Sequence, residues 1–374
     1  GGGIIGCACA YYLSREGVGV HLVERGPLAG GASGAGEGGI APPERPGIQA
    51  RLARATALLY QALVEELPLD IEYRKKGTLY LAESEEDWRC AEEACARMQT
   101  EGERCELLTP SQVVDLEPHV ARDIAGGAFY PDGGQVNPHL VTIGLAQGAR
   151  ARGAVIQTFT EVTGMELSPR NGAVMAVKTA RSRIPAGAVI NAAGAWSNAL
   201  GKMVGLNIPV VPRKGHIVVT EPTPPIIHCT TVTEVGYVRA SLSGEQALFV
   251  TLETEQPPSG NLLLGMSREF VGFDCSVSPG VVRAIISRHL RFFPANSGIH
   301  VIRTYAGLRP YSPDSVPIIS EAETVPGFYI ATGHEGEGIT LAPITGKLIA
   351  QMITGQEPDL PLGELALARF VHSG

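Results

Sequence analysis

The chain has 374 residues, of which 44% are hydrophobic and 18% are charged, and its net charge is −8. A chain of this length and composition can bury a large core and is expected to divide into two domains. The acidic balance, with no basic stripe, disfavours nucleic acid as a partner, and no apolar run reaches the roughly 18 residues that a membrane span needs.

The chain opens with a glycine motif. Gly1, Gly3 and Gly6 have the spacing G-x-G-x-x-G, and the small and apolar residues 4–16 predict a helix. Such a motif lies between a parallel strand and a helix, so we expect a strand of about five to eight apolar residues before Gly1. The turn gathers backbone N–H groups at the positive end of the helix dipole, and this arrangement suits a pyrophosphate.

An acidic residue favours a dinucleotide at this motif. Residues 17–25 predict a buried strand with Glu24 near its end, and a carboxylate in this position binds a ribose hydroxyl. A carboxylate at Glu24 favours an unphosphorylated ribose, and so FAD or NAD over NADP. The alternative is a glycine-rich turn with a surface glutamate. The loop 26–47 is too rich in Gly and Pro for regular structure, and so much exposed backbone suits a long cofactor such as FAD.

The middle of the chain alternates helices with β-rich segments. Helices are predicted at 49–66, at 84–104, after an N-cap at Thr109 or Ser111, and from about Pro138. A strand is predicted at Thr78–Ala82, another over 154–167, and a hairpin over 173–190. Residues 206–300 predict mostly alternating strands of an antiparallel sheet, at 213–221, 237–242, 247–253 and 261–267. The C-terminal part predicts a strand, a glycine loop and a helix.

The cysteines indicate no metal site. There are seven, none forms C-x-x-C, and no Cys/His spacing suggests zinc. We interpret them as buried or free thiols in a reducing cytosol, with a redox role as the alternative. We expect a cytoplasmic protein, and leave open whether it attaches to a membrane surface.

Five motifs, in order, give the chain a resemblance to a known family. They are GGGIIG, VERG…GASGAGEGGI, VINAAGAWS, AGLRPYSPDSVPIIS and ATGHEGEGITLAPITGKLIA. Together they resemble the D-amino-acid oxidase-like (DAO) family of FAD-dependent oxidoreductases. That family includes glycine and sarcosine oxidases and the β subunits of heteromeric opine, hydroxyproline and proline dehydrogenases and of hydrogen cyanide synthase.

The resemblance implies an α/β (α+β) fold, with an antiparallel-sheet substrate domain inserted into a Rossmann-like FAD-binding domain. The FAD-binding domain is expected to comprise 1–65, 136–205 and 300–374, and the substrate domain 66–135 and 206–299.

The resemblance also implies which residues contact FAD. The pyrophosphate turn would comprise Gly1, Gly3, Ile4, Ile5 and Gly6, and the adenosine end would meet Glu24, Arg25 and Val162. The ribityl chain and ring would meet Ala32, Ser33, Glu37, Gly38, Gly39, Ala193, Gly194 and Gly307. The last loop would contribute Gly333, Glu335, Gly336, Glu337, Gly338, Ile339 and Thr340. No cysteine falls in that loop, so the FAD is expected to be non-covalent.

Three residues are candidates for catalysis. Arg309 matches the arginine that holds a substrate carboxylate in glycine oxidase-like members, and a guanidinium suits that task because it makes two parallel hydrogen bonds. The alternative is that Arg309 pairs with Asp314. His334 faces the flavin or the substrate, or is structural; His216 opens a strand near the expected active site, or is a half-exposed strand residue.

The implied activity is oxidation of a small amino, imino or N-substituted amino acid by hydride transfer to flavin N5, with no obligatory base. The sequence shows no serine-hydrolase elbow and no paired catalytic carboxylates. The tail and the segment PRKGHIVVTEP favour a catalytic β subunit that passes electrons through an iron–sulfur α subunit to a quinone. The alternatives are a monomeric oxidase that produces hydrogen peroxide, a hydroxy-acid dehydrogenase, and a scaffold subunit without flavin.

Overall fold

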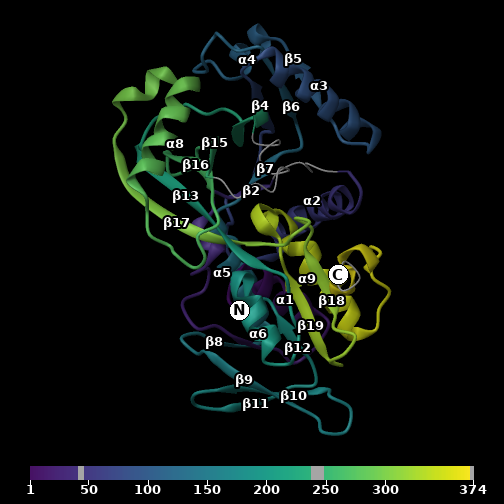
Figure 1. Ribbon diagram of the computed structural model, residues 1–374. Helices are drawn as coiled ribbons and strands as arrows, with labels where there is room; N and C mark the ends of the chain where they lie inside the picture. Colours follow the sequence, from purple (N-terminus) through teal and green to yellow (C-terminus); the bar gives the residue numbers. More distant parts are fainter. Residues whose placement is uncertain (41–45, 237–247, 371–374) are drawn as a thin grey trace.

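The computed structural model describes residues 1–40, 46–236 and 248–370, and Figure 1 shows a helix-rich half below a large sheet. The strand predicted at 237–242 and the first residue of the one predicted at 247–253 lie outside the described residues.

The longer helices occur at both ends and in the middle of the chain. They are α1 (Ile4–Arg15), α2 (Ile48–Glu66), α3 (Glu85–Thr100), α4 (Pro110–Leu116), α5 (Pro138–Ala151), α6 (Ser197–Lys202), α8 (Pro279–Phe292) and α9 (Gly338–Thr354). Single 3₁₀ turns lie at η1 (Ala32–Ala35), η2 (Gly194–Trp196), η3 (Pro294–Gly298), η4 (Glu335–Glu337), η5 (Gly363–Leu365) and η6 (Leu367–Phe370).

The short strands form small sheets. They are β1 (His21–Val23), β2 (Gly39–Ile40), β3 (Arg74–Lys75), β7 (Gly134–Gln135), β8 (Val155–Gln157), β9 (Val162–Leu167), β10 (Val174–Thr179), β11 (Arg183–Pro185), β12 (Val189–Asn191), β18 (Ile318–Glu321) and β19 (Phe328–Thr332). Strands β2, β7 and β3 make one of these sheets, and the others lie in the lower half of Figure 1. Strand β1 pairs with β8, and β12 with β19, in parallel. The α/β character predicted for the chain ends is confirmed.

Eight strands form the large sheet in the part of the chain that the structure describes. They are β4 (Thr78–Ala82), β5 (Glu106–Leu108), β6 (Gly126–Tyr130), β13 (Val211–Pro222), β14 (Thr231–Glu234), β15 (Phe249–Glu255), β16 (Asn261–Arg268) and β17 (Val301–Tyr311). Their order is β17-β13-β16-β15-β14-β4-β6-β5, and every pairing is antiparallel except that of β14 with β4. The sheet therefore combines segments from two distant parts of the sequence.

Close backbone approach holds the lower core together. Helix α1 packs against both α5 and α9. A Cβ built on Gly346 of α9 would lie 2.6 Å from the backbone carbon of Ala8, and one built on Gly148 of α5 would lie 2.7 Å from the ring of Tyr11. Only glycine permits these two contacts, so the residue type sets how near the helices lie.

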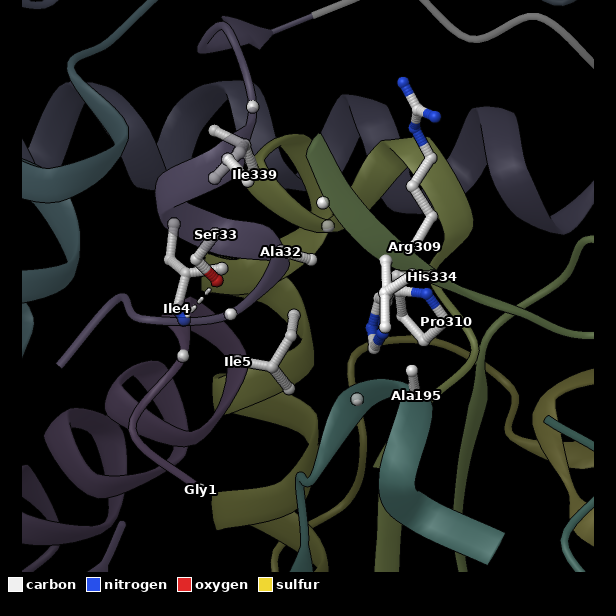
Figure 2. Close-up of a pocket in the computed structure, with 18 of the residues that line it drawn as sticks. Gly1, Ile4, Ile5, Ala32, Ser33, Ala195, Arg309, Pro310, His334 and Ile339 are labelled. Carbon is white, nitrogen blue, oxygen red and sulfur yellow. Dashed lines mark hydrogen bonds between the residues drawn. The ribbon is translucent and has the colours of Figure 1, made fainter. Parts of the chain in front are cut away.

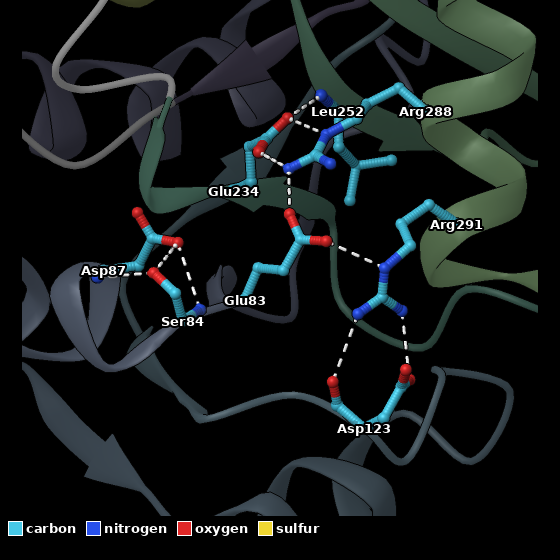
Figure 3. Close-up of polar contacts among 8 residues, drawn as sticks. All are labelled: Glu83, Ser84, Asp87, Asp123, Glu234, Leu252, Arg288 and Arg291. Atoms are coloured by element: carbon cyan, nitrogen blue, oxygen red, sulfur yellow. Dashed lines mark hydrogen bonds and ion pairs between the residues drawn. The ribbon is translucent and has the colours of Figure 1, made fainter.

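A network of charged side chains connects helix α8 to β14 and to the segments that follow β4 and precede β6 (Figure 3). Arg288 donates to Glu83 at 2.6 Å and makes two hydrogen bonds to Glu234. Arg291 donates to the second oxygen of Glu83 at 2.8 Å and to Asp123 at 3.0 Å. The network links the segments before and after α5, and the guanidiniums satisfy the buried carboxylate of Glu234 and the partly buried one of Glu83.

Most predicted elements are confirmed. The helices at 4–16, 49–66 and from Pro138 match α1, α2 and α5, and the strand Thr78–Ala82 matches β4. Thr109, not Ser111, caps α4, because its side chain and that of Gln112 bond reciprocally to backbone N–H groups.

Two predictions of secondary structure were wrong. The single strand predicted over 154–167 is two strands, since Phe159 has φ +52° and the chain leaves β8 there to enter β9 in another sheet. The segment 206–300 also contains helix α8, whose buried residues Val281, Ile285 and Phe292 follow the helical period.

The cysteines differ in part from expectation. Cys95 near the end of α3 and Cys105 form a disulfide with Cα atoms 5.6 Å apart, and the other five cysteines are free thiols. Among the described helices, none is both long and apolar enough to cross a membrane.

Candidate functional site

A cavity of about 430 Å³ extends from β9 below to the large sheet above. The glycine turn, η1, η2, η4 and strands β4, β14, β16 and β17 all contribute to its walls. Figure 2 shows Ile4, Ile5 and Ser33 on one side, and Arg309, Pro310 and His334 on the other.

Nearly all of the predicted site residues line this one cavity, although they come from six separate stretches of sequence. From the first half of the chain they are Gly1, Gly3, Ile4, Ile5, Glu24, Arg25, Ala32, Ser33, Glu37, Gly38 and Gly39. From residue 162 onward they are Val162, Ala193, Gly194, Gly307, Arg309, His334, Glu335, Gly336, Glu337, Gly338, Ile339 and Thr340. Gly6, Gly333 and His216 do not line it.

The glycine turn leaves the N-terminus of α1 open toward the cavity. No side chain caps the N-cap residue Gly3, and the N–H of Ile4 donates to the hydroxyl of Ser33 at 2.9 Å (Figure 2). Gly6 faces the turn itself, because a Cβ there would lie 1.9 Å from the carbonyl oxygen of Gly1. Gly6 therefore shapes the turn, and the helix N-terminus beside it is the arrangement that binds phosphate groups.

Glu24 lines the cavity and also fixes the loops that surround it. Its two oxygens accept hydrogen bonds from the N–H groups of Gly2, at 2.5 Å, and Gly26, at 2.7 Å. A carboxylate has about four acceptor positions, so these bonds leave capacity for a ribose hydroxyl.

The lower end of the cavity has an aromatic platform. The guanidinium carbon of Arg25 lies 4.0 Å from the ring centre of Trp196, and Trp196 stacks on Phe273 with ring centres 5.3 Å apart. Val162, the first residue of β9, lies in the same wall. Trp196 was not predicted as a site residue.

Arg309 is the cation at the upper end. Its guanidinium donates to the carbonyl of Ser267 at 3.0 Å and approaches the sulfur of Met266 at 3.8 Å. Within the described residues it forms no ion pair, and Asp314 is instead held by Arg369 through two hydrogen bonds. The alternative in which Arg309 pairs with Asp314 is thus contradicted, and the guanidinium faces the cavity with donors to spare.

Glu335 has several cationic neighbours. It accepts hydrogen bonds from Arg268 at 3.2 and 3.3 Å and lies 3.7 Å from Arg213. Burial alone would raise its pKa, but the guanidiniums of Arg268, Arg309 and Arg213 outweigh burial and lower the pKa of Glu335 to about 2. It is an ionised side chain that neutralises positive charge in the cavity wall.

His334 is buried in the wall. One ring nitrogen, Nε2, lies 3.0 Å from the hydroxyl of Thr345, and Nδ1 has no hydrogen-bond partner among the described residues. Burial lowers the pKa of His334 to about 3, so the imidazole is neutral at physiological pH.

His216 is separated from the other two candidates. Its Nε2 accepts a hydrogen bond from the N–H of Ser278 at 3.1 Å, so Nδ1 carries the proton and donates to Ser267 at 2.9 Å. Both ring nitrogens are therefore used inside the protein, and the side chain is fully buried rather than half-exposed as the alternative supposed.

The upper end also contains residues that local motifs did not predict. They are Thr78, Tyr80, Thr231, Thr233, Glu253 and Met266, which come from strands of the large sheet. No glycine motif marks them, and only the pairing of distant strands places them around the cavity.

The cavity residues fit FAD in three respects. The open N-terminus of α1 suits a pyrophosphate, Glu24 retains acceptor positions for a ribose, and a Cβ on Gly3 would lie 3.1 Å from Ser33, so glycine keeps the turn open. Gly338, the first residue of α9, also lines the cavity, so the positive end of a second helix dipole faces it. Within residues 1–40, 46–236 and 248–370, no cluster of His, Cys, Asp or Glu could hold a metal ion.

Comparison with known proteins gives a consistent result. The family model DAO, described as "FAD dependent oxidoreductase", matches residues 1–352. Glycine oxidase from Geobacillus kaustophilus is 30% identical over 99% of this chain and 96% of its own, and its crystal structure has a TM-score of 0.90 over 100% of this chain and 98% of that chain. The hydrogen cyanide synthase subunit HcnC of Pseudomonas aeruginosa is 28% identical over 99% of this chain and 95% of its own. The crystal structure of L-proline dehydrogenase from P. horikoshii has a TM-score of 0.90 at 25% identity, over 99% of this chain and 96% of that chain.

Proposed function

We propose a function from one premise: the chain belongs to the DAO family of FAD-dependent oxidoreductases, and its cavity residues fit that cofactor. On this basis the protein oxidises the carbon–nitrogen bond of a small amino, imino or N-substituted amino acid. Bound FAD accepts the hydride that leaves the substrate carbon. The observation that carries the proposal is Arg309, a guanidinium that faces the cavity with no ion pair among the described residues.

Arg309 would bind the substrate carboxylate and so fix the position of the adjacent carbon. Glu335 limits the net positive charge around it, and neutral His334 lines the same wall. His216 would act at a distance, since its bond to Ser267 orients the residue whose carbonyl accepts from Arg309.

The similarity to a synthase subunit and to proline dehydrogenase supports a catalytic β subunit that delivers electrons to a partner, either an iron–sulfur subunit or a quinone-linked acceptor. The similarity to glycine oxidase supports the alternative of an oxidase that yields hydrogen peroxide. Non-covalent FAD and the division into an FAD-binding domain (1–65, 136–205, 300–374) and a substrate domain (66–135, 206–299) are parts of the same proposal.

The test is anaerobic bleaching of the flavin absorption band of purified protein. The panel contains D- and L-amino acids, proline, hydroxyproline, sarcosine, opines and 2-hydroxyglutarate. Bleaching by an amine that reverses on admission of air indicates an oxidase; bleaching that persists until a dye is added indicates a dehydrogenase. Bleaching by the hydroxy acid alone would overturn the proposal.

A further inference from the structure

The upper end of the cavity contains the buried carboxylate of Glu37 in addition to the guanidinium of Arg309. Glu37 is only 8% exposed, lines the cavity, and has no hydrogen-bond partner for Oε1 within the described residues. An unpartnered carboxylate oxygen at such depth is costly unless a ligand satisfies it. Because Oε1 packs against Gly265, a donor from a bound substrate would meet the carboxylate where Glu37 lines the cavity.

The surroundings of Glu37 are crowded with charge. A Cβ on Gly265 of β16 would lie 2.2 Å from its Oε1, so the absence of a side chain there makes room for the carboxylate. Glu253 and Glu255 face it from β15, Arg268 from β16, and Arg309 and Tyr305 from β17.

The two other carboxylates differ in their access to the cavity. Glu255 accepts hydrogen bonds from Gln135 at 2.6 Å and Thr231 at 2.8 Å and does not line the cavity, whereas Glu253 does. Burial and the negative charges of Glu253 and Glu255 raise the pKa of Glu37 well above its ordinary value, against the opposing effect of Arg309 and Arg268. Above this raised pKa Glu37 is ionised, and its carboxylate then accepts a proton more readily than that of an ordinary surface acid.

A cation and a base at one end of a cavity match the two charges of an amino acid. We infer that Glu37 receives the ammonium nitrogen of the substrate whose carboxylate Arg309 holds, and takes the proton that must leave this nitrogen before oxidation. The inference rests on the proposed function. The N–H bond breaks, its electron pair stays on nitrogen as a lone pair, and the proton joins the Glu37 carboxylate. The neutral amine can then support departure of hydride from the neighbouring carbon to bound FAD.

This assignment also separates substrate classes. An amine presents the positive charge and the proton that Glu37 requires, whereas a hydroxy acid presents a neutral group. Glu37, which the resemblance placed beside the flavin, would therefore contact the substrate and favour amines over alcohols.

The test compares two unreactive ligands of nearly equal shape. α-Aminoisobutyrate has a carboxylate and an ammonium but no hydrogen on its α-carbon, and pivalate replaces the ammonium by methyl. Affinities for the FAD-loaded protein are measured by calorimetry and by perturbation of the flavin spectrum. The unmodified protein should prefer α-aminoisobutyrate, and Glu37→Gln should lower that preference by about tenfold or more. Pivalate affinity should persist, because Arg309 is intact.

Two further variants keep the inference open to refutation. Glu255→Gln removes a carboxylate that belongs to the same cluster but lies outside the cavity, so this variant should still prefer α-aminoisobutyrate over pivalate. Glu37→Asp keeps a carboxylate, so it should show part of the preference that Glu37→Gln loses. With a reactive amine, the anaerobic bleaching rate is followed from about pH 6 to about pH 10, and in Glu37→Gln the acid limb should move toward the pKa of the free ammonium.

The outcomes distinguish the two proposals. If amines bleach the flavin but Glu37→Gln keeps both the ligand preference and the pH profile, the inference about Glu37 is wrong and the proposed function stands. If neither ligand binds and no amine bleaches the flavin, the proposed function itself fails.

Discussion

Replacement of Arg309 by glutamine tests the carboxylate site most directly. The guanidinium would make two parallel charge-assisted hydrogen bonds to the substrate, each contributing about 1.5–2 kcal/mol in a partly buried site. Loss of both corresponds to about 3–4 kcal/mol, or about a few hundredfold in affinity. Arg309→Lys keeps the charge but loses the planar geometry, so its affinity for the substrate should lie between that of the unmodified protein and that of Arg309→Gln.

The assay compares a substrate with the amine that lacks its carboxylate, for example glycine with methylamine. Anaerobic flavin reduction gives the apparent affinity and limiting rate for each. The unmodified protein should prefer the amino acid strongly, and Arg309→Gln should lose that preference while its affinity for the simple amine changes little. Arg303→Gln is the matched control, because Arg303 is an exposed arginine on the same strand.

A loss of less than about threefold in affinity for the amino acid would refute the assignment, since two desolvated hydrogen bonds to a carboxylate contribute more than that. An equal loss for both ligands would indicate general damage to the cavity.

Three further predictions concern stability. Glu335 has a pKa of about 2 against an ordinary 4.5, so its ionised form stabilises the fold above about pH 4.5. About 3 kcal/mol of the free energy of unfolding is lost as the pH falls toward 2. In urea unfolding, Glu335→Gln should lack this acid sensitivity and be less stable at neutral pH. Arg288→Met should lower the free energy of unfolding by about 3 kcal/mol, because it leaves buried Glu234 without its ion pair, and Arg291→Met should cost less, because its partner Asp123 is exposed; equal losses would contradict this. Gly346→Ala should cost about 1–3 kcal/mol in thermal unfolding, because the new Cβ meets the backbone of α1; an unchanged melting temperature would show that the helices can separate freely.

Local motifs predicted residues that the structure places around one cavity. The glycine turn, Ser33 and the last loop are short stretches whose backbone itself approaches the ligand, so their residue types are visible in the sequence. The structure brings them together as expected. His216 was predicted because its strand was expected to lie near the active site. The side chains of alternate strand residues point to opposite faces of a sheet, however, and the ring of His216 contacts Ser267 and Ser278.

The upper end of the cavity could not be predicted in the same way. Glu37 belongs to the second glycine motif, whereas Glu253 belongs to no motif and lies near Glu37 only because β15 and β16 pack against the loop that carries Glu37. The sequence analysis accordingly found no paired carboxylates. Helix α8 was missed for another reason. Its apolar residues have helical spacing, but the whole segment 206–300 was predicted as mostly strands because most of its apolar runs alternate.

The single parallel pairing in the large sheet has a consequence for biosynthesis. Strand β4 is buried along its whole length and pairs with β14, and Thr230 at the start of this junction bonds to Gly77, 153 residues earlier. At ribosomal rates of about 5–20 residues per second, that partner appears roughly 8–30 s after β4 has been made. For this time β4, which pairs with β6 along its other edge, presents an apolar, unpaired edge outside the ribosome, where chaperones can bind it and aggregation can begin. The yield of the protein in cells should therefore depend more on the speed of translation between β6 and β14 than on the stability of the finished fold.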